Sequence, residues 1–239
     1  MPGAFEFLSS AVRDQLISVL VGGAVTATVA YLRWQTTLRL PARRTWRYDG
    51  GDQLAVVVAA SAHVDTGTYQ RPHTGIGQVR AMSLLVPQLV RAYRNVDLEQ
   101  VRLSSQVRGR DLEADLLTLG GPKNNSVTEQ LLARIQGLPF TVTGTAIDWG
   151  GTVYDGQARE GRVVLDFGYV VRAPNPFCPE RRIVVIAGSH TFGTVAAARW
   201  MAEHGGDSAI PRDVAVLVEA DVLDDGHVIS PRMLEQVAL

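Results

Sequence analysis

Two glycine-rich turns hold the residues best suited to bind or transform a ligand. The turn at 120–126 follows an apolar run at 114–119, and the turn at 188–191 follows another at 182–187. Each turn precedes a helix-forming segment, so free backbone N–H groups and the positive end of a helix dipole should meet there and favour an anion. The candidate ligand-binding residues are Gly120, Gly121, Lys123, Asn124, Asn125 and Ser126 in the first turn and Gly188, Ser189, His190 and Thr191 in the second.

Three of these side chains have distinct expected roles. Lys123 would supply a positive charge to an anion, and the Ser189 hydroxyl would donate to a phosphate or a hydroxyl. His190 would contact the ligand or act as an acid or base near neutral pH. The alternative is that the turns are ordinary helix starts, since Asn and Ser are favoured cap residues. The residues that would cap are Asn125 or Ser126 in the first turn and Ser189 or Thr191 in the second.

A third polar loop, at 61–77, adds His73 and Thr74 to the candidate site, and Arg80 lies one turn into the helix that follows. The glycines at 75 and 77 do not form a dinucleotide fingerprint, because the third glycine position is Arg80 and the glycines lie far beyond the preceding strand. No P-loop is present either. Arg80 would reach a phosphate or would simply be solvated.

The sequence gives less support for catalysis or metal binding than for ligand binding. Ser189 sits at a strand-to-helix elbow with His63, His73 and Asp65 available from another loop, but its surroundings do not match the G-x-S-x-G elbow. The five histidines have no metal-binding spacing, so no metal site and no cofactor are expected. Cys178 is the only cysteine, which excludes an intrachain disulfide. Whether the protein is an enzyme stays open.

The N-terminal region predicts a membrane anchor. Residues 15–32 contain no charge over 18 residues, the lower limit for a membrane-spanning helix. A cleaved signal peptide and a buried soluble helix are the alternatives. Five arginines at 33, 39, 43, 44 and 47 follow the run and only Arg13 precedes it, which places the C-terminal domain in the cytoplasm. The expected location is a single pass through the inner or plasma membrane.

The domain boundaries follow from this prediction: an N-terminal segment at 1–14, an anchor helix at 15–34, a basic linker at 35–52 and a ligand-binding domain at 53–239. Pro41 and the glycines at 50 and 51 should interrupt the linker. Small residues at four-residue spacing, such as Gly23 and Ala27, would let anchor helices approach closely, so a homo-oligomer is possible.

The pattern of the domain predicts an α/β fold with an open, Rossmann-like, mostly parallel sheet and helices on both faces. Buried strands at 54–60, 114–119 and 182–187 alternate with helices at 77–93, 126–136 and 194–203, and a weaker strand lies at 100–104. Pro87 should kink or divide the first helix. Residues 140–177 should form an inserted antiparallel ribbon, and 214–229 a strand pair that turns at 224–226.

The turns Gly120-Gly-Pro-Lys-Asn-Asn125 and Ala187-Gly-Ser-His-Thr-Phe-Gly193 resemble those of prokaryotic Rossmann-like domains and are similar to the SLOG/CARF type of nucleotide-sensing domain. This resemblance implies binding of nucleotides or cyclic oligonucleotides, and for membrane-tethered members a role in defence. The related phosphoribohydrolases carry a Pro-Gly-Gly-x-Gly-Thr turn. This chain lacks that turn, which argues against nucleosidase activity.

These observations favour a membrane-anchored cytoplasmic sensor or effector that binds a nucleotide-like anion, in signalling or defence. One alternative is a membrane-tethered hydrolase of a nucleotide, an NAD-like compound or an ester. The other is a membrane-tethered protein-interaction module with no small ligand. The formal net charge of −1 gives no electrostatic basis for binding a DNA or RNA duplex.

Overall fold

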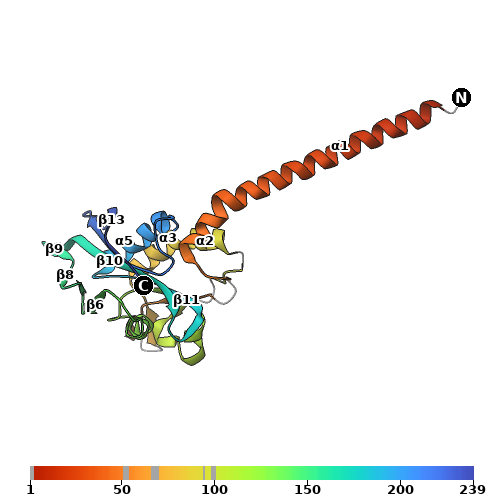
Figure 1. Ribbon diagram of the computed structural model, residues 1–239. Helices are drawn as coiled ribbons and strands as arrows, with labels where there is room; N and C mark the ends of the chain where they lie inside the picture. The colour runs from red at the N-terminus through yellow and green to blue at the C-terminus, as the bar shows by residue number, and fades with distance from the viewer. Residues whose placement is uncertain (1–2, 51–53, 66–69, 94, 98–100) are drawn as a thin grey trace. The chain divides into compact units, whose positions relative to one another are not determined.

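The computed structural model describes residues 3–50, 54–65, 70–93, 95–97 and 101–239, with side chains at 3–14, 16 and 62–72 left undescribed. The chain divides into two compact units, Met1–Pro41 and Ala42–Leu239 (Figure 1). The second unit begins before the expected boundary at residue 53. Ala42 and Trp46 belong to its hydrophobic core, which explains the earlier start.

The first unit is helical. Helix α1 spans Gly3–Trp34 and continues as a π-helical turn, Gln35–Arg39. The helical stretch Ile17–Trp46 is long and apolar enough to cross a membrane. Within it, the hydroxyls of Thr26 and Thr28 donate to backbone carbonyls four residues earlier, so these polar groups are satisfied inside the helix.

Pro41 does not interrupt the helical path, contrary to the sequence-based prediction. Helix α2 spans Leu40–Trp46 and follows the π-helical turn directly. Proline has no N–H to donate to the carbonyl four residues before it. The backbone adapts one residue earlier, where the N–H of Leu40 donates to the carbonyl of Gln35, five residues back. The residues at 47–50 are non-helical, and Gly51 lies outside the described residues.

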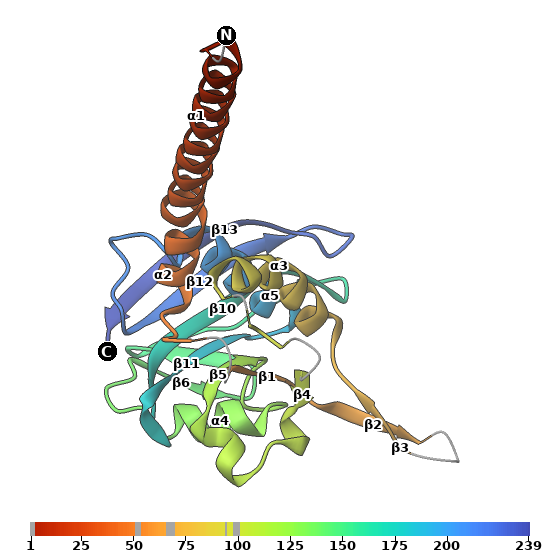
Figure 2. The same cartoon turned by 90° about the vertical axis from the view of Figure 1, so that its right-hand side faces the viewer.

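The second unit is built on an eight-stranded sheet in the order β13-β12-β10-β11-β5-β1-β4, with β9 paired to β10 (Figure 2). Strands β4, β1, β5 and β11 run parallel, and β9, β10, β12 and β13 form antiparallel pairs. The strand bounds are β1 Leu54–Val58, β4 Val101–Leu103, β5 Asp115–Leu119, β9 Gln157–Arg159, β10 Arg162–Asn175, β11 Cys178–Gly188, β12 Val214–Val222 and β13 Val228–Ala238.

The fold class is confirmed as α/β, but the expectation of a mostly parallel sheet is wrong. The reason is β10, whose run at 166–173 is buried and lies inside the sheet between β11 and β12. The sequence prediction placed this run in an inserted ribbon because it follows short hairpin strands. Only the strands before it form a separate three-stranded sheet: β6 Phe140–Thr143, β7 Ala146–Trp149 and β8 Thr152–Tyr154.

Each face of the main sheet has its own hydrophobic cluster. Alternate strand residues such as Val56 and Leu117 pack with helices α3 and α5, whereas Val57 and Leu116 pack with α4 and the three-stranded sheet on the other face. This alternation follows from the two-residue period of a strand. The helix bounds are α3 Ile76–Ala92, α4 Ser126–Leu132 and α5 Thr191–His204.

Two further local predictions are corrected. Pro87 lies inside α3, which stays a single helix. The segment expected to be a long loop at 61–74 contains a hairpin of β2, Ser61–Asp65, and β3, Gln70–His73. The predicted pair at the C-terminus is confirmed as β12 and β13, and the N–H of Gly226 donates to the carbonyl of Leu223 in the turn between them.

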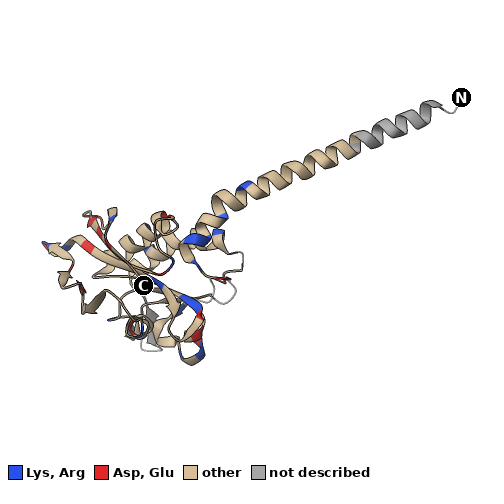
Figure 3. Ribbon diagram, viewed as in Figure 1, with Lys and Arg blue, Asp and Glu red and all other residues tan. Residues whose placement is uncertain are grey.

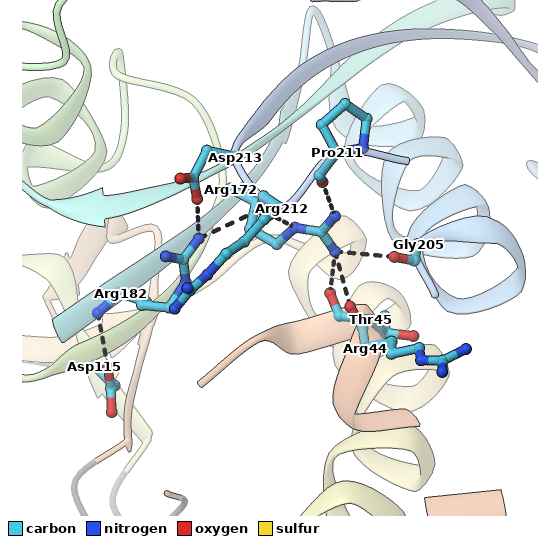
Figure 4. Close-up of polar contacts among 9 residues, drawn as sticks. All are labelled: Arg44, Thr45, Asp115, Arg172, Arg182, Gly205, Pro211, Arg212 and Asp213. Atoms are coloured by element: carbon cyan, nitrogen blue, oxygen red, sulfur yellow. Dashed lines mark hydrogen bonds and ion pairs between the residues drawn. The ribbon is translucent and has the colours of Figure 1, made fainter. Parts of the chain in front are cut away.

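A buried arginine connects four separate parts of this unit. The guanidinium of Arg172, on β10, donates to the backbone carbonyls of Arg44, Thr45, Gly205, Pro211 and Arg212 (Figure 4). Burial lowers the pKa of Arg172 to about 10, which leaves it charged at neutral pH. The carbonyls of Thr45 and Gly205 belong to the C-terminal ends of α2 and α5, where a positive charge also complements the helix dipole.

Candidate functional site

The strand order places a cleft where ligands usually bind in α/β sheets. Strand β1 lies between β4 and β5. After β1 the chain passes through α3 to β4 on one side of β1, and then crosses to β5 on the other side. At such a switch point the loops at the carboxyl ends of the strands diverge and open a crevice. A cleft of about 230 Å³ lies here, lined by Gln78, Gly121, Pro122, Lys123, Asn124, Val142, Gly144, Thr145, Gly188, Ser189, His190, Thr191 and Thr194.

Some residues of the first glycine turn stabilise the fold, and others line the cleft. Asn125 is fully buried and caps α4, because its side-chain oxygen accepts from the N–H groups of Val127 and Thr128, both at 3.1 Å. The capping interpretation is therefore confirmed for Asn125. Gly120, with φ +103°, packs against Ala59, where a Cβ would collide.

Three residues of this turn, Gly121, Lys123 and Asn124, line the cleft. Gly120, Asn125 and Ser126 do not, and the Ser126 hydroxyl donates to the carbonyl of Ser104 instead. Lys123 is the only lysine among the 23 basic Lys and Arg residues of the chain. It makes no ion pair within the described part of the chain, so its charge is available to a ligand.

Asp166 on β10 accepts hydrogen bonds from the backbone of the second turn. The sequence prediction did not include this residue. Its fully buried carboxylate accepts hydrogen bonds from the backbone N–H groups of Gly193 at 2.6 Å, Phe167 at 2.9 Å and His190 at 3.2 Å. Burial raises the pKa of Asp166, while these N–H bonds and His190 act in the opposite direction. The carboxylate thus caps the N-terminus of α5.

This cap changes the expected chemistry of the second turn. An anion at the start of α5 was predicted, and the protein places its own carboxylate there. A second anion beside Asp166 would be repelled. The signal in the sequence was a single acidic residue at the start of a buried apolar run at 166–173, but nothing in the sequence indicates that β10 lies beside the start of α5.

Glycines allow this close contact between α5 and the sheet. A Cβ on Gly193 would collide with the carbonyl oxygen of Phe167, and a Cβ on Gly188 would collide with the backbone of Gly193. The first turn of α5 therefore rests directly on β10 and β11. The glycine spacing that suggested a ligand turn is explained by backbone packing, while Gly188 still lines the cleft.

His190 lies beside the same carboxylate, but its Nδ1 makes no hydrogen bond with any described residue. Its Nδ1 lies 3.5 Å from Oδ1 of Asp166, and Gly156 covers that side of the ring, where a Cβ would meet Nδ1. Nε2, on the opposite side of the ring, is the nitrogen left to face a ligand. The side chain is 36% exposed and lines the cleft.

Two buried hydroxyls beside the cleft have no hydrogen-bond partner among the described residues. They belong to Ser189, which is 6% exposed, and Tyr169, which is fully buried. The Tyr169 hydroxyl lies 3.8 Å from the position of a Cβ on Gly121. Burying a hydroxyl without a partner is unfavourable, by about 1–3 kcal/mol. Of the two, only Ser189 lines the cleft, so a ligand there could supply the bond that its hydroxyl lacks.

The remaining predicted residues lie elsewhere. His73 ends β3, and the buried Thr74 hydroxyl has no partner among the described residues, but neither residue lines the cleft. Arg80 donates to the carbonyl of Gly226 at 2.6 Å and lines a different cavity, of about 210 Å³, with Arg199. The side chains of His63 and Asp65 lie outside the described residues.

The sequence prediction also missed cleft residues from other elements. Gln78 belongs to the first turn of α3, and Gly144 and Thr145 belong to the turn between β6 and β7. No cluster of three or more metal-binding side chains occurs among the described residues. Cys178 is half-buried and lines a separate cavity of about 540 Å³.

Comparisons with known proteins do not identify a family for this chain. No protein-family model matches the sequence, and no curated protein matches it. The functional argument therefore depends on the geometry of the cleft.

Proposed function

We propose that this chain is a membrane-anchored sensor whose Ala42–Leu239 unit binds a nucleotide-like anionic ligand. The observation that carries the proposal is a pair of unsatisfied groups that line one cleft: the ammonium of Lys123 and the hydroxyl of Ser189, neither of which has a partner among the described residues. A cleft at a strand switch point with a few convergent polar groups is the usual form of a small-molecule site. The parallel half of the sheet supports a Rossmann-like description of this unit.

The charges suggest how such a ligand would lie. Its phosphate belongs beside Lys123, because the carboxylate of Asp166 makes the opposite end of the cleft unfavourable for an anion. The hydroxyls of a sugar belong beside Ser189 and Nε2 of His190, which offer a donor and an acceptor.

The N-terminal helix supports membrane attachment. Basic residues gather on the helical segment that follows the apolar part of α1 (Figure 3). They are the arginines at 33, 39, 43, 44 and 47, and the positive-inside rule then puts the Ala42–Leu239 unit in the cytoplasm. Gly22 and Gly23 leave open space on α1, which would allow anchor helices to associate. Ligand binding would act on this association in signalling or defence.

The proposal is tested by thermal unfolding of the full chain in detergent micelles with a panel of nucleotides and sugar phosphates. A binding nucleotide at 100 times its Kd should stabilise the protein by about 2.7 kcal/mol. Lys123→Ala and Ser189→Ala should remove most of this effect, while Lys123→Arg, which keeps the charge, and Ser83→Ala, outside the cleft, should retain it. No stabilisation by any nucleotide, or full binding by Lys123→Ala and Ser189→Ala, would reject the proposal.

The single lysine allows an independent test. An amine-acylating reagent can modify only Lys123 and the α-amino group. A nucleotide bound in the cleft should slow acylation of Lys123 and leave the α-amino group unaffected, as measured by peptide mass spectrometry. Equal acylation of Lys123 with and without a stabilising nucleotide would place the ligand elsewhere.

A second candidate function, hydrolysis of the bound ligand, is favoured by the proximity of His190 to Asp166 and by the presence of Ser189 in the same cleft. A carboxylate that orients an imidazole leaves the distal nitrogen as a general base. Turnover of a nucleotide, an NAD-like compound or an ester that disappears in His190→Ala while binding persists would establish this function. Binding without turnover by the wild type would leave the sensor function alone.

A further inference from the structure

A second, apolar groove adjoins the cleft. It has a volume of about 260 Å³ and lies between α4 and β6. Pro122 and Val142 line both the groove and the cleft, so the two are adjacent. The groove walls are Pro122, Glu129, Leu132, Ala133, Leu138, Phe140, Thr141 and Val142.

The chemistry of the groove differs from that of the cleft. Its walls are mostly aliphatic, apart from the ring of Phe140, which is buried and held against Trp149 and Tyr169 at centroid distances of 5.1 and 4.8 Å. Such walls favour a flat or apolar group that leaves water. Lys123 follows Pro122 directly, so the positive charge lies next to the point where groove and cleft meet.

From this adjacency and the apolar lining of the groove, we infer that the groove binds the nucleobase of the nucleotide bound in the cleft. The inference rests on the proposed function and makes it more specific. The phosphate lies beside Lys123, and the base enters between Leu132 and Val142. A volume of about 260 Å³ accommodates a purine, which is far smaller than the drug-sized ligands that fill pockets of roughly 300–1,000 Å³.

Glu129 adds base selectivity. Its carboxylate is the only charged group that lines the groove among the described residues, and it makes no ion pair with any of them. A carboxylate accepts hydrogen bonds from amino groups and repels carbonyl oxygens. The ligand class is therefore a nucleotide whose base carries an exocyclic amino group, as adenine does and uracil does not.

The test separates the two halves of the site in the full chain in detergent micelles. Ala133→Phe fills the groove from an exposed position, so the fold should tolerate it. It should weaken adenosine monophosphate at least tenfold and leave ribose 5-phosphate binding unchanged. Lys123→Ala should do the reverse, weakening ribose 5-phosphate and leaving adenosine unchanged. Binding is measured by calorimetry.

Selectivity is read from Glu129→Gln, which should reduce the preference for adenosine monophosphate over uridine monophosphate at least threefold. The inference is overturned if Ala133→Phe, with an unchanged melting temperature, binds adenosine monophosphate as well as the wild type does. In that case the nucleotide still binds and the proposed function stands. If neither nucleotide, adenosine nor ribose 5-phosphate binds the wild type, the proposed function and the inference both fail.

Discussion

The carboxylate of Asp166 accepts a hydrogen bond from the N–H of Gly193 at 2.6 Å, which joins the middle of the sheet to the first turn of α5. The contact fixes three features of the cleft at once. It starts α5 beside the end of β11, it holds the backbone N–H of His190, and it occupies the place where an anion would otherwise bind. On the proposed function, the charge of the ligand would therefore lie beside Lys123, at the other glycine turn.

Asp166→Asn should destabilise the Ala42–Leu239 unit by about 1–3 kcal/mol, because the amide NH₂ cannot accept from the backbone N–H groups that the carboxylate satisfies. Urea unfolding of the two proteins measures the difference. If Asp166→Asn has the same free energy of unfolding as the wild type, α5 does not depend on this cap.

The stability difference between the wild type and Asp166→Asn should depend on pH, because the pKa of Asp166 is raised in the folded protein. The folded protein holds the proton to a higher pH than the unfolded chain, whose value is near 3.8. The advantage of the wild type over Asp166→Asn should therefore be largest below pH 3.8 and should shrink as pH rises through the raised value. An advantage that grows with pH would show that the hydrogen bonds outweigh burial.

Tyr169→Phe should leave the ligand-free protein unchanged or stabilise it by up to about 1 kcal/mol, because it removes a buried hydroxyl that has no partner among the described residues. The same change should alter nucleotide binding little, because Tyr169 is fully buried and does not line the cleft. The matched control is Tyr93→Phe, which removes a hydroxyl bonded to the carbonyl of Tyr48 at 2.7 Å and should cost about 1 kcal/mol. Thermal unfolding with and without nucleotide measures both effects, and equal destabilisation by the two changes would contradict the assignment.

Arg172→Met should destabilise the protein by at least about 3 kcal/mol, because it leaves carbonyls from three segments without their donor. Arg159→Ala, at an exposed position on β9, is the control and should stay within about 0.5 kcal/mol of the wild type. Urea unfolding compares them. A mild effect of Arg172→Met would mean that these carbonyls find water when the guanidinium is removed.

The orientation in the membrane is tested with a reporter fused after Leu239. On the proposed topology, a reporter that works only outside the cytoplasm should stay inactive, because basic residues that follow an apolar helix favour the cytoplasmic side. Replacing the arginines at 33, 39 and 43 with glutamine should weaken this bias. Strong activity of the original fusion would reverse the topology.

Much of the local structure was predictable because it depends on neighbouring residues. The valine-rich run at 54–60 indicated β1, the run at 114–119 indicated β5, and Asn125 was recognised as a possible cap. Apolar periodicity and capping preferences act over a few residues, so a single sequence contains them. The apolar stretch of α1 was predictable for the same reason.

The sequence by itself thus determined the strands and helices of the parallel half, the apolar N-terminal helix and the two glycine turns. Only the tertiary structure decided that β10 lies inside the sheet, that Asp166 caps α5 from 27 positions away in the chain, and that Tyr169 reaches Gly121. The tertiary structure also shows that Arg80 lines another cavity and not the cleft. These relationships depend on strand order, and strand order is set by the packing of the whole core rather than by any local pattern.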